Sequence, residues 1–116
     1  MKSIKEKFTV PLFGADVWIL VDPDIRKARR TLDKHFGKTE VENDHCYAWC
    51  EYQPGRFALC FSSDSIGLGV VAHEIFHATR RICKWASVHD EETGALLHEF
   101  LVKKIFKILR ARGWNR

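Results

Sequence analysis

The segment from Val71 to His77 sets two histidines four residues apart within an apolar stretch, in the pattern H-E-x-x-H. Residues four apart lie one above the other on the same face of an α-helix, so His73 and His77 can direct imidazole nitrogens at one metal ion. Ile75 and Phe76 make the segment mostly apolar, whereas a fully solvated helix carries mainly charged and polar residues. The pattern therefore predicts a packed helix that holds a metal site.

Glu74 follows the first histidine directly and stands one step round the helix from it. From this position a carboxylate can reach a metal-bound water without binding the metal itself, which suits a general base in hydrolysis. The alternative is that His73 and His77 are ordinary core or surface residues, because five-residue matches occur in helices by chance. We predict Glu74 as the catalytic residue and the two histidines as metal ligands.

A catalytic zinc site needs a third protein ligand, and two candidates lie downstream. A break at residues 86–89 precedes a final helix that opens with Glu91 and Glu92. The tract 68–78, followed by this acidic pair and Ala95, resembles small phage and prophage zinc metallopeptidases, which are gluzincin-like members of the zincins. The resemblance covers residues 60–110 and implies zinc as the cofactor.

The same resemblance implies Glu92 as the third ligand, because this residue stands three before Ala95, whose small side chain would let the two helices approach closely. The helical wheel favours Glu91 instead, since Glu91 lies at the centre of the apolar face of the final helix. The first residues of a helix follow the wheel only loosely, so we keep Glu92 as the prediction. For either glutamate, the alternative role is to complement the helix dipole at the N-terminus.

Four cysteines raise the question of a disulfide or a second metal site: Cys46, Cys50, Cys60 and Cys83. The gap between Cys46 and Cys50 lies in a strand-like segment and lacks the turn that zinc knuckles use, although His45 with these cysteines could in principle bind zinc. Cytosolic cysteines in apolar strands are mostly buried small hydrophobic residues. We expect that role here.

A chain of 116 residues can bury one core and is too short for a second, so we expect a single domain over residues 1–116. Its 46% apolar content is that of a globular protein. No apolar run approaches the length that crosses a bilayer, and the charged first seven residues do not resemble a signal peptide. We expect no membrane partner and a cytoplasmic location, which is the host cytoplasm if the chain is phage-encoded.

The net charge of +4 is modest, and much of it comes from basic residues near the C-terminus. Such a stripe is most often the solvated face of an amphipathic helix, and we expect that here. The alternative is an acidic partner such as nucleic acid. The residues concerned are Lys103, Lys104, Lys107, Arg110, Arg112 and Arg116.

The pattern of apolar residues predicts four short strands and three helices. Pro11 marks the first strand as an edge, because proline cannot donate to a hydrogen-bonded ladder. The tract Gln53-Pro54-Gly55 predicts a hairpin, and the polar residues 62–65 supply N-caps for the metal helix. The expected strands are residues 8–13, 15–21, 46–52 and 56–61, and the expected first helix is residues 25–36, capped by residues 22–24 and ended by Gly37.

This order of elements is that of a minimal zincin: an α+β fold with a short antiparallel or mixed sheet, an H-E-x-x-H helix and a C-terminal glutamate helix. In the larger enzymes that it resembles, an edge strand binds an extended peptide by strand addition, and residues 57–61 are the candidate here. The predicted function is hydrolysis of peptide bonds in a peptide or protein substrate. His98 shares a face with Glu91 and could support a ligand or stabilise an oxyanion.

Two other classes of function fit the same residues. A DNA-associated protease of the SprT type is suggested by the basic C-terminal helix, and its third ligand would be a histidine, His89 or His98. A non-catalytic, zinc-stabilised binding protein is suggested by the small size of the chain and by the lack of a clear oxyanion donor.

Overall fold

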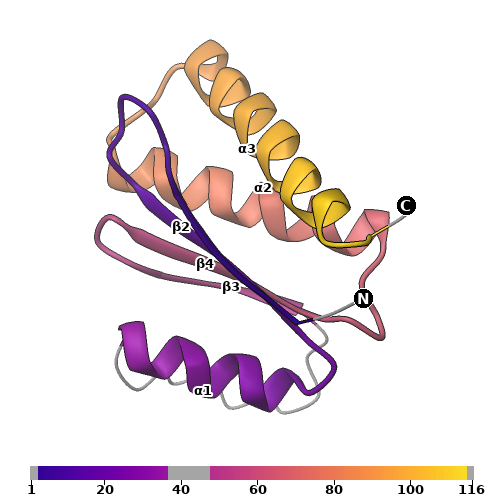
Figure 1. Cartoon of the computed structure of the whole chain (residues 1–116). Helices are drawn as coiled ribbons and strands as arrows, with labels where there is room; N and C mark the ends of the chain where they lie inside the picture. The colour runs from indigo at the N-terminus through magenta and orange to yellow at the C-terminus, as the bar shows by residue number, and fades with distance from the viewer. Residues whose placement is uncertain (1–2, 37–47, 115–116) are drawn as a thin grey trace.

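A computed structural model describes residues 3–36 and 48–114 of the chain. It is an α+β fold, as predicted, in which one helix covers one face of a mixed sheet and two helices cover the other (Figure 1). The elements in chain order are β1 (Ile4–Thr9), β2 (Asp16–Asp22), α1 (Ile25–Phe36), β3 (Ala48–Gln53), β4 (Arg56–Ser62), α2 (Leu68–Trp85) and α3 (Glu91–Ala111).

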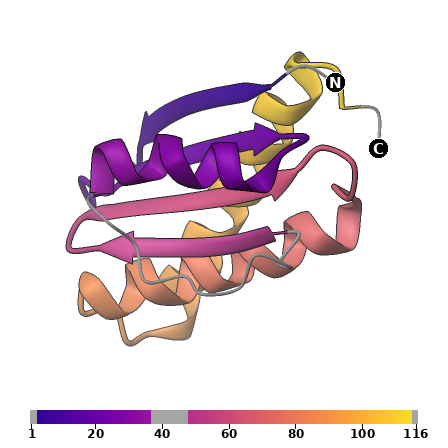
Figure 2. The same cartoon turned by 90° about the horizontal axis from the view of Figure 1, so that it is seen from below.

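The sheet has the strand order β1-β2-β4-β3. The outer pairs are antiparallel, whereas β2 and β4 run parallel, so the chain must cross over between them. Helix α1 lies in this crossover and packs across β2 and β4 (Figure 2). Because β4 pairs along both of its edges, the prediction that residues 57–61 form an edge strand is wrong, and the edges of the sheet are β1 and β3.

The first strand lies earlier in the chain than predicted. It begins at Ile4 and ends at Thr9, and Pro11 falls in the turn that follows it. Leu12 and Gly14 both have positive φ in this turn, at 72° and 68°. The strand is an edge, as expected, but Pro11 terminates it instead of lying within it.

Apolar side chains of the sheet form one cluster on each face. Strand β4 contributes to both, because its successive side chains alternate: Phe57, Leu59 and Phe61 face α2 and α3, while Ala58 and Cys60 face α1. A strand buried on both faces is apolar throughout, which explains the unbroken run of apolar residues in β4. Cys60 is fully buried, as expected for a small hydrophobic residue.

The helix boundaries follow the local signals at α1 and α3 but not at the start of α2. Asp24 Oδ1 accepts a hydrogen bond from the backbone N–H of Arg26, and Asp90 Oδ2 accepts one from Thr93. The prediction that residues 62–65 cap α2 is wrong, since the N-cap is Gly67 and no side chain bonds there. Gly37, the predicted stop of α1, lies outside the described residues. Among the described residues, no helix combines the length and the apolar character that a membrane span requires.

Trp85, the last residue of α2, joins this helix to the β3–β4 turn. Its ring meets Phe57 edge-on, with ring centroids 6.0 Å apart. Gly55 has a φ of +76° in the turn, and a Cβ added there would lie 3.2 Å from the Trp85 ring. Gly55 is therefore required for two reasons: the positive φ of the turn and the close approach of the Trp85 ring.

We predict that Gly55→Ala destabilises the fold more than Gly14→Ala. Both glycines have positive φ, which costs an alanine about 1–2 kcal/mol. Only Gly55 also faces a neighbouring side chain, whereas nothing lies within 4 Å of a Cβ added at Gly14. Urea unfolding of the two variants measures the difference, and equal losses would show that Trp85 does not press on the turn.

Candidate metal centre

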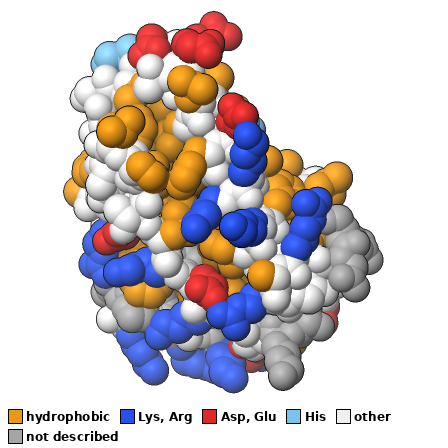
Figure 3. Space-filling model, turned by 45° about the horizontal axis from the view of Figure 1, so that its top comes forward, with side chains coloured by type: hydrophobic (Ala, Val, Ile, Leu, Met, Phe, Trp, Pro, Cys, Tyr) orange, Lys and Arg blue, Asp and Glu red, His pale blue; other side chains and the backbone are white. Residues whose placement is uncertain are grey.

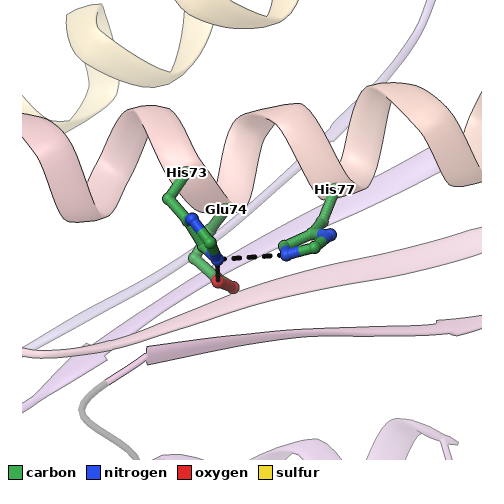
Figure 4. A group of neighbouring side chains, drawn as sticks. All are labelled: His73, Glu74 and His77. Carbon is green, nitrogen blue, oxygen red and sulfur yellow. Dashed lines mark hydrogen bonds and ion pairs between the residues drawn. The ribbon is translucent and has the colours of Figure 1, made fainter.

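His73, Glu74 and His77 lie together on α2 (Figure 4). The Nε2 atoms of the two histidines are 3.1 Å apart, and Nε2 of His73 is 3.7 Å from Oε1 of Glu74. One ligand atom from each residue lies within 4.8 Å of the others. The group could therefore hold a metal ion, and the structure brings together these three predicted site residues.

The separation of the two imidazole nitrogens fits shared coordination. Histidine nitrogens bind zinc at about 2.0–2.1 Å, so two of them in tetrahedral geometry stand about 3.3 Å apart. The observed 3.1 Å is close to this value. Without an ion, the same distance permits a hydrogen bond between one protonated and one unprotonated ring nitrogen. The fold thus holds the ring nitrogens of His73 and His77 at a chelating distance.

The packing of α2 on the sheet sets the exposure of these side chains. Val71, Ile75, Ala78 and Ile82 form the buried face of the helix. Glu74 lies beside this face and its side chain is only 7% exposed, whereas the side chain of His73 is 69% exposed. The carboxylate therefore approaches the histidine pair from the protein side, and solvent reaches the pair from outside.

Glu74 carries a buried carboxyl group whose hydrogen-bonding capacity is not filled. Within the part of the chain that the structure describes, its Oε2 atom is buried and has no hydrogen-bond partner. Burial raises the pKa of this carboxyl, and the nearby His77, His73 and Arg81 lower it in part. A buried carboxylate without full hydrogen bonding is costly, and an adjacent cation would offset that cost. This is a second indication of a cation site, independent of the histidine spacing.

Glu92 and Glu91 are exposed in the first turn of α3 and lie outside the group. Helix α3 packs on a different side of α2, where Thr79 Oγ1 is 3.1 Å from His98 Nδ1. Thr79 comes six residues after His73, and at about 100° per residue its side chain points roughly 120° away from that histidine. The structure does not bring Glu92 to the histidines, and its assignment as third ligand stays a prediction.

The close approach of the two helices occurs at Gly94 and not at Ala95. A Cβ added at Gly94 would lie 3.7 Å from the Cys83 sulfur, whereas Ala95 is exposed. Cys83 is six residues beyond His77, about 9 Å further along the helix axis at 1.5 Å per residue. The N-terminus of α3 therefore meets the far end of α2, away from the histidine pair.

A groove of about 970 Å³ lies between α2 and α3, and no sequence pattern predicted it. His89, Glu91 and His98 line it, and so does Phe76, whose ring neighbours His77. Neither His89 nor His98 belongs to the metal group, so the roles predicted for them as ligand or oxyanion donor stay predictions. Helix packing creates the groove, and no local motif could have revealed it.

Neither of the cysteine side chains that the structure describes, Cys60 and Cys83, belongs to the metal group. Cys83 lies half-buried in the groove between the helices, and burial raises the pKa of its thiol, which disfavours the thiolate that binds metals. His45 and Cys46 lie outside the described residues, as does the side chain of Cys50.

We predict that Glu74→Gln stabilises the metal-free protein at neutral pH. Because the folded pKa of Glu74 is raised, this carboxyl favours folding at acid pH, and that contribution is lost as the pH rises through the folded pKa. Glutamine stays neutral throughout, so the variant should gain on the order of a few degrees in Tm at pH 7.

The rise in Tm caused by Glu74→Gln should vanish at a pH below the ordinary glutamate pKa, where both proteins carry an uncharged group at position 74. Thermal unfolding of both proteins in the presence of a chelator measures the difference in Tm. A variant that is less stable than the parent at neutral pH would show that the buried carboxylate is stabilising.

No family model matches this chain, and neither does a curated protein or a solved structure. What is inferred about function therefore rests on the residues of α2 and their surroundings.

Proposed function

We propose that this protein is a zinc-dependent metallopeptidase in which His73 and His77 bind the ion and Glu74 is the general base. The observation that carries the proposal is the pair of imidazole nitrogens 3.1 Å apart beside a buried, partly unbonded carboxyl group. Two histidines four apart on a helix are the core of many catalytic zinc sites. The resemblance to small phage-type zincins inferred from the H-E-x-x-H motif and the downstream acidic pair would imply the same activity.

The chain and the ion would divide the chemistry between them. Bound zinc supplies a Lewis acid, which acidifies a water and polarises the substrate carbonyl. Glu74 accepts the proton of that water and passes it to the leaving amine. Its raised pKa brings it closer to neutral pH, where a base can both accept and release a proton. Its burial against the sheet keeps the carboxylate in one position beside His73.

Strand β3 is the better candidate for binding an extended peptide, because β4 is fully paired. Among the residues that the structure describes, β3 ends the strand order, and one of its backbone edges has no partner strand. Helix α2 packs against both β3 and β4, so this edge lies on the side of the sheet that carries the metal group. A peptide added to β3 would gain main-chain hydrogen bonds and run beside the histidines.

A zinc-stabilised binding protein is the second candidate, and one observation favours it. Glu74 lies within the group itself, so its carboxylate could bind the ion together with the two histidines. In that case Glu74 could not serve as the general base, and the ion would stabilise this part of α2 without catalysing a reaction. A DNA-associated protease with a histidine as third ligand is less favoured, since His89 and His98 both lie outside the group.

We predict that the protein binds about one zinc ion per chain and that His73→Ala and His77→Ala each abolish tight binding. Each substitution leaves a single histidine, which cannot chelate. Metal analysis after reconstitution and dialysis at neutral pH measures the content. A parent protein without zinc would sink both candidate functions.

Glu91→Ala and Glu92→Ala serve as matched controls that also test the third ligand. Both glutamates are exposed and lie outside the metal group, so with the helices arranged as described both variants would keep their zinc. Loss of zinc in Glu92→Ala alone would mean that α3 moves to supply the ligand implied by the resemblance to zincins.

Glu74→Gln separates the two candidate functions. If Glu74 is the base, the variant keeps its zinc, and hydrolysis of an unfolded protein substrate falls by about two to four orders of magnitude. Zinc content and peptide release are measured on the same preparation. Loss of zinc would instead identify Glu74 as a ligand and favour the binding protein.

A further inference from the structure

Helix α1 carries a charge as large as that of the whole chain. It holds five basic residues and one acidic residue, a formal charge of +4, and the chain as a whole also has +4. The formal charges of all other residues therefore sum to zero. The residues of α1 concerned are Arg26, Lys27, Arg29, Arg30 and Lys34, with Asp33 as the acidic one.

The basic side chains of α1 point away from the sheet. Its apolar side is used for the core, where Ala28, Leu32 and Phe36 are buried against β2 and β4. Lys27, Arg30 and Lys34 are exposed. Their spacing of three and four residues sets them on one side of the helix, so they form a continuous stripe.

Strand β1 extends this stripe across the sheet. Lys7 pairs with Trp18 and Lys5 with Leu20; Leu20 belongs to the cluster beneath α1, and Trp18 packs against that cluster. Lys5 and Lys7 are exposed and therefore lie on the same face of the sheet as α1. Lys5 and Lys27 also line one shallow hollow of about 170 Å³. We call Lys5, Lys7, Lys27, Arg30 and Lys34 the basic face.

Figure 3 shows how charged side chains are distributed on one face of the molecule. Lysine and arginine side chains gather toward the lower part of the view, the end at which α1 lies in Figure 1. Acidic side chains lie at the upper end of this view and also among the basic side chains lower down.

This arrangement of charge works against the stability of α1. Like charges three and four residues apart repel each other. The first turn holds Arg26 and Lys27 and no acidic residue, although the N-terminus of a helix favours negative charge. Asp24 partly compensates, since its carboxylate lies 3.3 Å from Arg26 Nε. Folding alone does not call for the stripe Lys27, Arg30 and Lys34.

We propose that the basic face binds the phosphate backbone of double-stranded nucleic acid. A row of exposed cations on a helix, flanked by two lysines on a strand, is complementary to the dense negative charge of a duplex. The interaction would neutralise phosphates without reading bases, so it would be salt-dependent and largely independent of sequence.

A membrane surface and a single strand fit this face less well. An interfacial helix inserts an apolar face into the lipid, and the apolar residues of α1 are already buried in the core. Single-strand binding relies on exposed aromatic rings that stack with bases. Of the described aromatic rings on this face, Phe36 is buried, and Trp18 is half-buried and has the Lys7 ammonium 5.4 Å from its centroid.

The basic face and the metal group lie on opposite faces of the sheet, since α1 covers one face and α2 the other (Figure 1). A duplex bound along α1 would leave the histidine pair exposed on the other side. The inference does not depend on the proposed peptidase activity, and its test needs no bound metal.

The test compares two triple variants that remove the same charge from different faces. Lys27→Gln/Arg30→Gln/Lys34→Gln alters the basic face, and the control Lys103→Gln/Lys107→Gln/Arg110→Gln alters α3. Each removes two lysines and one arginine, and all six side chains are exposed. Binding to a short, fluorescent, mixed-sequence DNA duplex is followed by anisotropy over a range of salt concentrations.

We expect the α1 variant to lose most of its affinity, with the salt slope reduced by up to about 2.7, at about 0.9 per phosphate neutralised. The control should bind as the parent does. The α1 variant should also keep the parent's zinc content and a Tm that is unchanged or raised, because repulsion within α1 is relieved.

Three outcomes would overturn the proposal: no binding by the parent, equal loss of affinity in both triple variants, or tighter binding to anionic phospholipid vesicles than to the duplex. Equal loss would assign the interaction to net charge or to the C-terminal stripe. Preference for vesicles would assign the face to a membrane surface.

Discussion

The packing of α2 on the sheet is the constraint on which the candidate centre depends. Ile75, Ala78 and Ile82 are fully buried, which fixes the rotation of the helix about its axis. With this rotation Glu74 falls at the margin of the buried face, and the two histidines fall on the solvent side of that margin. A rotation by one residue in one direction would expose the carboxylate, and in the other direction it would carry both histidines toward the core. The contact of Trp85 with the β3–β4 turn holds the far end of the helix in the same arrangement.

The electrostatics of the group follow from that placement. A carboxyl group taken out of water, with one oxygen lacking a hydrogen-bond partner, favours an adjacent positive charge. Two imidazoles at a chelating distance offer a place for that charge within reach of solvent. Metal binding and the stability of α2 are thereby linked, since the ion would compensate for the burial of Glu74.

The features that were predictable from sequence are those that depend on neighbouring residues. The four-residue spacing of His73 and His77 places both side chains on the same face of one helix. The hairpin depends only on the backbone dihedral angles of the turn that contains Gly55. The strand order was not predictable in this way, because the parallel pairing of β2 with β4 joins segments far apart in the chain. For the same reason the sequence did not reveal that Lys5 and Lys7 share a face with α1. The position of Glu92 depends on how α3 turns and slides against α2, which no single helix pattern encodes.

The most direct measurement is a crystal structure of the zinc-loaded protein with anomalous diffraction recorded at the zinc absorption edge. The arrangement described here predicts one anomalous peak about 2.0–2.1 Å from Nε2 of both His73 and His77, with the Glu74 carboxylate beside it and at least one position left for water. A peak elsewhere in the chain, or no peak after loading at neutral pH, would contradict the assignment of the metal centre to α2.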